Sequence, residues 1–165
     1  MNTQTVKLLI PTSDGTFLAH YSKNGLAELN FPHRHERGSE TQVRNKLPTE
    51  IRKWHQTTVT ALKEMLAGKK VKNFPPLDMV GTDFQKSVWR TMRRIPPGQT
   101  KSYGEIAKAI GKPHAVRAVG GACGANPIPV LVPCHRVLAA NKKIGGFSSG
   151  LSWKRKLLAK EGIVA

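Results

Sequence analysis

Three short apolar runs near the amino terminus alternate with sequences typical of tight turns. The runs cover residues 6–10, 16–21 and 26–31. Asp14-Gly15 and Asn24-Gly25 separate them, and these dipeptides supply the positive φ angles that hairpin turns need. The pattern predicts a three-stranded β-meander, followed by a polar loop over 32–47.

The apolar positions then change to helical spacing. The residues that recur with this period are Ile51, Trp54, Thr58, Ala61, Leu62, Met65 and Leu66. They predict a helix over 49–66, which Gly68 can end. Residues 69–80 contain Pro75-Pro76 and show no period, so they are expected to be extended. We therefore divide the chain into an N-terminal α/β lobe (1–75), a linker (76–82) and a C-terminal lobe (83–165).

The C-terminal lobe is predicted to be mostly helical. A first helix over 84–94 has Thr82 as its N-cap candidate. A capping box from Ser102 to Glu105 opens a second helix. Pro113 is expected at the first position of a third, over 114–122. Two short helices joined by a glycine-containing turn predict a helix-turn-helix, and the whole chain is expected to be an α/β (α+β) protein.

Charge changes the picture, because it points to a partner. The net charge is +17 and the isoelectric point is near 10.4. Residues 81–165 hold 15 basic and 3 acidic side chains, a net of +12. Such a field attracts polyanions, so nucleic acid is the expected partner. A solubility device or a surface for an acidic protein are the alternatives.

Composition excludes several classes. The longest apolar run, 128–132, contains a proline and is too short to span a bilayer. The first five residues lack the layout of a secretion signal, so a soluble cytoplasmic protein is expected. The cysteines, Cys123 and Cys134, are expected to be reduced and form no Cys-x-x-Cys pair. His33-x-His35 is either a surface metal site or part of a loop. We expect no metal and no cofactor.

The stretch 126–137 carries the candidate chemistry, because an apolar run ends in Cys134, His135 and Arg136. A thiol becomes a nucleophile as the thiolate, which needs a base or a positive field. His135 can be the base, and Arg136 or a short helical turn starting at Cys134 can supply the field. Adjacent residues of an extended strand point apart, so a bend after Pro133 or a bridging water is required. The alternative is that Cys134 is a small core residue.

Two further features need an explanation. Gly120 and Gly121 fall inside a predicted helix, where each costs about 0.8–1 kcal/mol relative to alanine. Close approach of DNA or of a neighbouring protein element would account for them. Glu161 falls in the last turn of a helix that Ser148 or Ser149 is expected to cap. A carboxylate there opposes the helix dipole, which indicates a partner such as a histidine, or else a local ion pair.

Residues 133–137, Pro-Cys-His-Arg-Val, resemble the active-site signature of the O6-alkylguanine-DNA alkyltransferases. The likeness extends through 102–107, 117–122, 126–127 and 157–162 and covers essentially all of 81–165. Residues 1–80 match only in layout. The resemblance implies a ribonuclease-H-like N-terminal lobe and a helical C-terminal lobe with a helix-turn-helix. Some relatives bind zinc through N-terminal cysteines, which are missing here.

The resemblance also implies an activity. This is direct, irreversible, single-turnover transfer of an alkyl group from O6-alkylguanine in DNA to Cys134, after the damaged nucleotide is flipped out. O4-alkylthymine is a further expected substrate. His135 is similar to the base, which acts through a water, and Glu161 to the acid that orients it. Asn126 resembles the residue that braces the active-site turn.

Other positions are implied to bind the lesion and the duplex. Tyr103 would contact the flipped base or its phosphate, Pro129 would form a pocket wall, and the backbones of Cys134, Val137 and Ser148 would read the base edges. Ser149, a glycine in some relatives, is expected to narrow the pocket. The DNA-binding surface is expected to comprise Tyr103, Gly104, Arg117, Ala118, Gly120 and Gly121.

In this resemblance Arg117 fills the stack, and the helix enters the minor groove of double-stranded DNA with little sequence preference. We expect a monomer in the cytoplasm, associated with the nucleoid in a prokaryote, or in the nucleus in a eukaryote. Two other functions stay open. One is a non-catalytic lesion-binding protein of the same build, and the other is a cysteine hydrolase that uses Cys134 and His135.

Overall fold

The computed structural model describes residues 5–34 and 47–165, and it begins with the predicted meander. Strands β1 (Val6–Thr12), β2 (Gly15–Ser22) and β3 (Gly25–Asn30) form an antiparallel sheet in sequence order. Ile10 pairs with Phe17 across the first hairpin, and Leu18 with Asn30 across the second. Most of the predicted loop at 32–47, including His35, lies outside the described residues.

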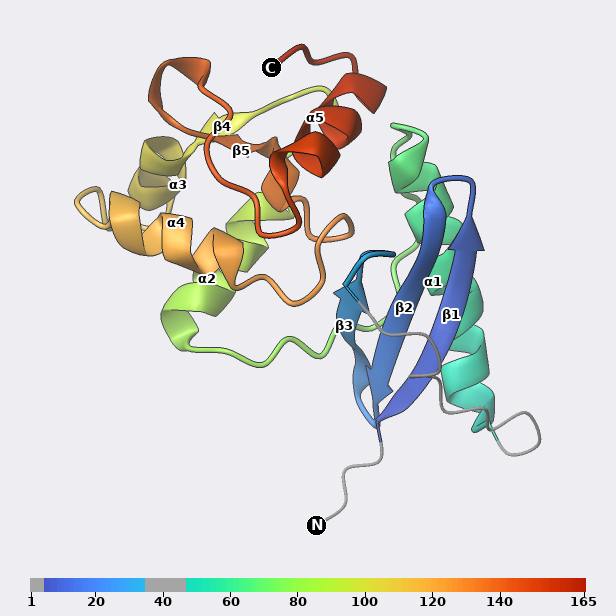
Figure 1. Ribbon diagram of the computed structural model, residues 1–165. Coiled ribbons are helices and arrows are strands. Elements are labelled where there is room, and N and C mark those ends of the chain that lie inside the picture. Colours follow the sequence, from blue (N-terminus) through green and yellow to red (C-terminus); the bar gives the residue numbers. More distant parts are fainter. Residues whose placement is uncertain (1–4, 35–46) are drawn as a thin grey trace.

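Helix α1 (Thr49–Leu66) has the predicted bounds and covers one face of the sheet (Figure 1). Its buried face consists of Ile51, Thr58, Ala61, Leu62, Met65 and Leu66. Most of these are three or four residues apart, so they lie on one side of the helix. The hydroxyl of Tyr21 and Nδ1 of His55 lie 2.9 Å apart and share a hydrogen bond between sheet and helix.

The segment after α1 returns to the sheet before it enters the C-terminal half. Leu26 donates its N–H to the carbonyl of Pro76 at 2.8 Å, and its own carbonyl accepts from Asp78 at 2.8 Å. Leu77 thereby makes an isolated parallel bridge with Leu26. The expected extended conformation is present, and the hydrogen bonds hold the segment against β3. The proposed division at 76–82 stays a prediction.

The C-terminal half contains the predicted helices with shifted bounds. Helix α2 (Asp83–Met92) carries the capping box of Thr82, and α3 (Tyr103–Ala109) that of Ser102. Helix α4 runs from Val116 to Gly124, so the expected start at His114 with Pro113 in the first position is wrong. Pro113 lies instead in a turn that the N–H of Ala115 closes onto the carbonyl of Lys112 at 2.9 Å.

Short elements then lead to the last helix. A 3-10 helix η1 (Cys134–Arg136) precedes β5 (Val137–Leu138), which pairs in parallel with β4 (Lys101–Ser102). A second 3-10 helix, η2 (Ala140–Lys142), follows. Helix α5 (Leu151–Lys160) has Gly150 at its N-cap and no side-chain cap, so the expected capping by Ser148 or Ser149 is wrong.

One hydrophobic core continues through both halves of the molecule. Trp153 of α5 packs against Phe31 in a tilted arrangement, with ring centroids 4.8 Å apart, and makes an edge contact with Phe17 at 5.8 Å. Phe147 lies 6.0 Å from Phe31. The loop before α5 therefore packs, through Phe147, against Phe31, which directly follows β3. Across residues 5–34 and 47–165, no helix is long and apolar enough to cross a membrane.

Candidate active site

The segment before Cys134 is a braced, strained turn. The Asn126 side chain donates to the carbonyl of Val132 at 2.8 Å and accepts from the N–H of Ile128 at 3.0 Å. Between them, Val130 has a φ of 74°, which is unusual for a β-branched residue. Strain of this kind persists only where surrounding contacts enforce it, and it is frequent at functional sites. Asn126 thus fixes how the chain enters the cysteine.

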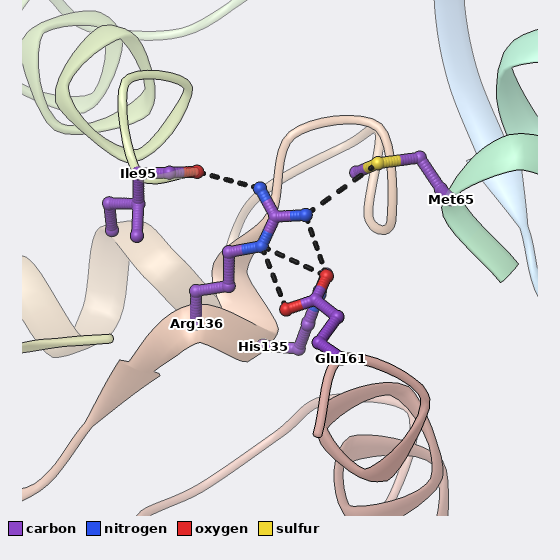
Figure 2. A network of polar contacts seen from close by, with 5 residues as sticks. All are labelled: Met65, Ile95, His135, Arg136 and Glu161. Atoms are coloured by element: carbon purple, nitrogen blue, oxygen red, sulfur yellow. Dashed lines mark hydrogen bonds and ion pairs between the residues drawn. The ribbon is translucent and has the colours of Figure 1, made fainter. Parts of the chain in front are cut away.

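Cys134 and His135 would point to opposite faces in an extended strand, but here both belong to the 3-10 helix η1. Successive side chains of such a helix are about 120° apart, rather than on opposite faces. Cys134 lines a cavity, whereas His135 and Arg136 both turn to Glu161 at the end of α5 (Figure 2). The predicted bend after Pro133 is therefore a helical turn. It directs Cys134 to the cavity and directs His135 and Arg136 to Glu161.

Cys134 is 6% exposed and lies on the wall of a cavity of about 330 Å³. The cavity lies between helices α3 and α4 and the loop before α5. Its lining residues are Tyr103, Gly120, Cys123, Gly124, Cys134, Gly146, Phe147 and Ser148. Three glycines leave it roomy, and Tyr103 and Phe147 supply aromatic surface. The thiol is buried, but a flat ligand that enters this cavity can reach it.

His135 and Glu161 form a buried hydrogen bond of 3.1 Å, between Nε2 and Oε1. A carboxylate only accepts, so Nε2 carries the proton and Nδ1 presents a lone pair. Nδ1 is buried and has no hydrogen-bond partner in the parts of the chain that the structure describes. Burial lowers the pKa of His135 despite the opposing effect of Glu161, so the imidazole is a neutral base.

The sequence hypothesis allowed Arg136 to supply the positive field at the thiol, but its guanidinium bonds to Glu161 instead. Its Nε lies 3.0 and 3.1 Å from the two oxygens of Glu161, and Nη2 lies 2.6 Å from Oε1 (Figure 2). Burial alone would raise the pKa of Glu161, but hydrogen bonds and charges from His135 and Arg136 lower it to about 2. The carboxylate is therefore ionised although its side chain is only 1% exposed.

The charge of Lys154 lowers the pKa of the Cys134 thiol, and sequence reasoning missed this residue. Its side chain is completely buried, and Nζ donates to the carbonyls of Val137 at 2.8 Å and Gly146 at 3.0 Å. Burial raises the pKa of Cys134, while a hydrogen bond from Asn126 and the charge of Lys154 oppose this shift. The resting nucleophile is thus a protonated thiol.

The predicted lesion-binding residues other than Val137 divide between two cavities, whereas Val137 is completely buried and its carbonyl accepts the hydrogen bond from Lys154. Tyr103 and Ser148 line the Cys134 cavity, and burial raises the pKa of the Tyr103 phenol. Pro129 lines an adjoining cavity of about 440 Å³, together with Asn126 and Ser148. Ser149 also lines that second cavity, so the expectation that it narrows the thiol pocket is not met. Ser148 is shared by both.

Helix α4 presents a small-residue surface. Arg117, Ala118 and Gly121 are exposed, and Gly120 borders the thiol cavity. Outside the backbone of α4 itself, a Cβ built on Gly120 or Gly121 would meet no atom of the described residues within 4 Å. Close packing against another protein element therefore does not explain these glycines. Gly104 lies in the first turn of the neighbouring α3.

Cys123 is the second residue that sequence reasoning missed. It lines the same cavity, and burial raises its pKa to about 12. Its thiol donates to Sδ of Met92 at 3.5 Å. A signal was available, because Gly120, Cys123 and Gly124 are three and four residues apart and share one face of a helix. Within the described ranges, no group of three or more His, Cys, Asp or Glu side chains could hold a metal ion.

Known proteins resemble this chain in sequence. The family described as "6-O-methylguanine DNA methyltransferase, DNA binding domain" matches residues 83–163. A methylated-DNA–protein-cysteine methyltransferase of Methanosarcina acetivorans is 58% identical over 82 residues, 50% of this chain and 53% of the relative. The match therefore spans about half of that relative's length. One from Methanosarcina barkeri is 38% identical over 156 residues, 93% of this chain and 94% of the relative.

A solved structure extends the likeness to the fold. The crystal structure of Mycobacterium tuberculosis OGT in complex with DNA has a TM-score of 0.76 and 38% identity, covering 93% of this chain and 90% of that chain. The mixed α/β class predicted from the sequence is thus confirmed. Sequence likeness along nearly the whole of the M. barkeri protein, with the Pro-Cys-His-Arg-Val turn at the cavity, places this chain in the 6-O-methylguanine DNA methyltransferase family.

Proposed function

We propose that this protein repairs DNA by moving an alkyl group from O6-alkylguanine, or O4-alkylthymine, to its own Cys134 in a single irreversible turnover. One observation carries the proposal: a buried thiol lines a cavity, beside a histidine that hydrogen-bonds a buried carboxylate. The net charge of +12 in residues 81–165 supports a duplex as the substrate. The relative from M. tuberculosis has been solved with DNA bound.

The burial of Cys134 requires that the damaged base leave the stack. A thiol at the wall of a cavity cannot reach an atom inside a duplex, so the nucleotide must be extruded into the pocket. Extrusion costs a few kcal/mol, less for a poorly paired lesion, which favours damaged sites. Arg117, exposed on α4, fills the vacated stack in this proposal.

The small exposed surface of α4 supports a close approach to the duplex. Ala118 and Gly121 add little bulk beside Arg117, and no element within residues 5–34 and 47–165 packs against Gly121. We assign this surface to the minor groove, where recognition is degenerate and suits a repair protein without sequence preference. Action as a monomer on chromosomal DNA, in the cytoplasm or nucleus, belongs to the same proposal.

The transfer is a displacement at carbon. Cys134 gives its proton to Nδ1 of His135, through a water, and its sulfur forms a bond to the alkyl carbon as the bond from carbon to O6 breaks. The electron pair of that bond leaves with guanine, which takes a proton from the Tyr103 hydroxyl. Exchange with solvent then restores the phenol and the neutral imidazole. The product is a thioether without a good leaving group, so Cys134 is not regenerated.

A labelled-substrate experiment tests this function. Duplex DNA with a labelled O6-methylguanine is incubated in excess over the protein, and a parallel duplex carries O4-methylthymine. We expect up to one label per chain, located by peptide mass spectrometry on Cys134 and not on the neighbouring Cys123. Cys134→Ala should abolish transfer. Binding without transfer would favour the lesion-binding alternative, and repeated ester or amide cleavage without label on the protein would favour a hydrolase.

A further inference from the structure

The Arg136 side chain makes hydrogen bonds to three residues, Ile95, Met65 and Glu161, yet the proposed transfer does not use it. Its guanidinium lies at the centre of Figure 2, between the end of α2, the end of α1 and the end of α5. Nη1 donates to the carbonyl of Ile95 at 2.6 Å, and Nη2 lies 3.8 Å from Sδ of Met65. The remaining contacts go to Glu161. The guanidinium is therefore held from three parts of the fold, and each of its three nitrogens has a partner.

The contacts to Glu161 are bidentate and leave little freedom to the carboxylate. Arginine presents a planar fork that matches the two oxygens of a carboxylate, whereas lysine is a point charge. Since Ile95 fixes the opposite edge of the guanidinium, the fork cannot rotate without breaking a buried hydrogen bond. Oε1 of Glu161 is thus kept within 3.1 Å of Nε2 of His135.

We propose that Arg136 is a positioning residue for the alkyl transfer: it holds Glu161 against His135 and cancels the carboxylate charge, so that His135 stays an uncharged base. This rests on the proposed function. It does not require Arg136 to touch the substrate or the sulfur.

The electrostatic part follows from the groups around the imidazole. Burial is the largest influence and lowers the pKa of His135; Glu161 from the end of α5 raises it, and the charges of Arg136 from η1 and Lys154 from α5 lower it further. Cys134 precedes His135 on η1. A buried carboxylate alone would favour imidazolium, which cannot accept the proton of the thiol. The positive charge of Arg136, less than 3 Å from Oε1, offsets that effect.

The test uses the full chain with Arg136→Gln, Arg136→Lys and the double variant Arg136→Gln with Glu161→Gln. The control is Arg155→Gln, which removes the same charge from the exposed face of α5. The titration of His135 is followed by NMR at its Cε1 proton, assigned with His135→Gln. In parallel, the single-turnover transfer rate from O6-methylguanine DNA is measured against pH.

In Arg136→Gln we expect the titration midpoint of His135 to rise by about one pH unit or more. The acid limb of the rate profile should move with it, which lowers the rate about tenfold at pH values below the new midpoint. Arg136→Lys should keep the midpoint within about half a unit, because the charge remains, but should transfer more slowly because the fork is lost. The control should behave as the wild type.

The double variant removes the stranded carboxylate charge, so it addresses the case in which Arg136→Gln does not fold. In it the midpoint should return to the low wild-type range, while transfer stays slow. A folded Arg136→Gln whose midpoint and rate profile match the wild type would overturn the proposal, as would a double variant with a raised midpoint. The NMR titration needs no DNA. A wild type that transfers no label would refute the proposed function and leave the role of Arg136 to be judged by the midpoint.

Discussion

Truncation of Asn126 is expected to loosen the turn that delivers the nucleophile. Asn126→Ala removes the acceptor of the Ile128 N–H and the donor to the Val132 carbonyl. Ile128 and Val132 are completely buried, so water cannot replace either bond without rearrangement. Each buried polar group left without a partner costs about 1–3 kcal/mol. Since relaxation recovers part of this, we expect a loss of about 2–4 kcal/mol.

Urea denaturation at equilibrium measures this loss as a change in midpoint at constant m-value. The matched control is Asn30→Ala, because Oδ1 of Asn30 is buried without a hydrogen-bond partner among the described residues. Truncation there strands no acceptor or donor, and we expect a loss below about 1 kcal/mol. Equal losses in the two variants would refute the view that the Asn126 amide braces the turn. The transfer rate of Asn126→Ala should also fall in conditions where the protein is fully folded.

Two further changes test other parts of the fold. Gly68 has a φ of +70°, and a Cβ built on it would lie 2.1 Å from the carbonyl oxygen of Lys160, so Gly68→Ala should destabilise the protein by about 2–4 kcal/mol in thermal unfolding. Gly111→Ala, at a φ of +75° with no atom of the described chain within 4 Å of the added Cβ, should cost only about 1–2 kcal/mol. A similar cost at both sites would contradict the close contact at Gly68. Because the pKa of Glu161 is lowered to about 2, its ionised form stabilises the fold above the ordinary carboxyl range. That stability should be lost as pH falls from about 4.5 toward 2. Urea midpoints of Glu161→Gln should lack this loss, and an unchanged acid dependence would count against the ion pair.

Sequence patterns predicted the elements that carry long or specific signals. Helix α1 matched because six apolar positions and Thr58 repeat along its 18 residues. Helix α2 was located by its N-cap candidate Thr82, and α3 by the capping box of Ser102 and Glu105. The start of α4 was misplaced, since proline fits a first helical turn but equally fits the turn closed by Lys112 and Ala115. Strands β4 and β5 have two residues each, too few for any period to appear.

Side-chain directions were harder to predict than elements. Lys154 stands in a basic run, Lys154-Arg155-Lys156, that is typical of a solvated helix face, yet it is buried against two carbonyls. Nothing in the local sequence distinguishes it from its neighbours, because its partners are 8 and 17 residues away. The orientation of Arg136 depended likewise on a 3-10 turn, which rotates it away from the thiol and onto Glu161.

The burial of Cys134 also bears on how long one molecule remains usable. Thiols are attacked by peroxides and small electrophiles mainly as thiolates, and burial raises the pKa of this one. With the cavity empty, the sulfur is both shielded and protonated. Under the single-turnover function proposed above, this burial keeps the reactive atom from being consumed by metabolites that carry no lesion.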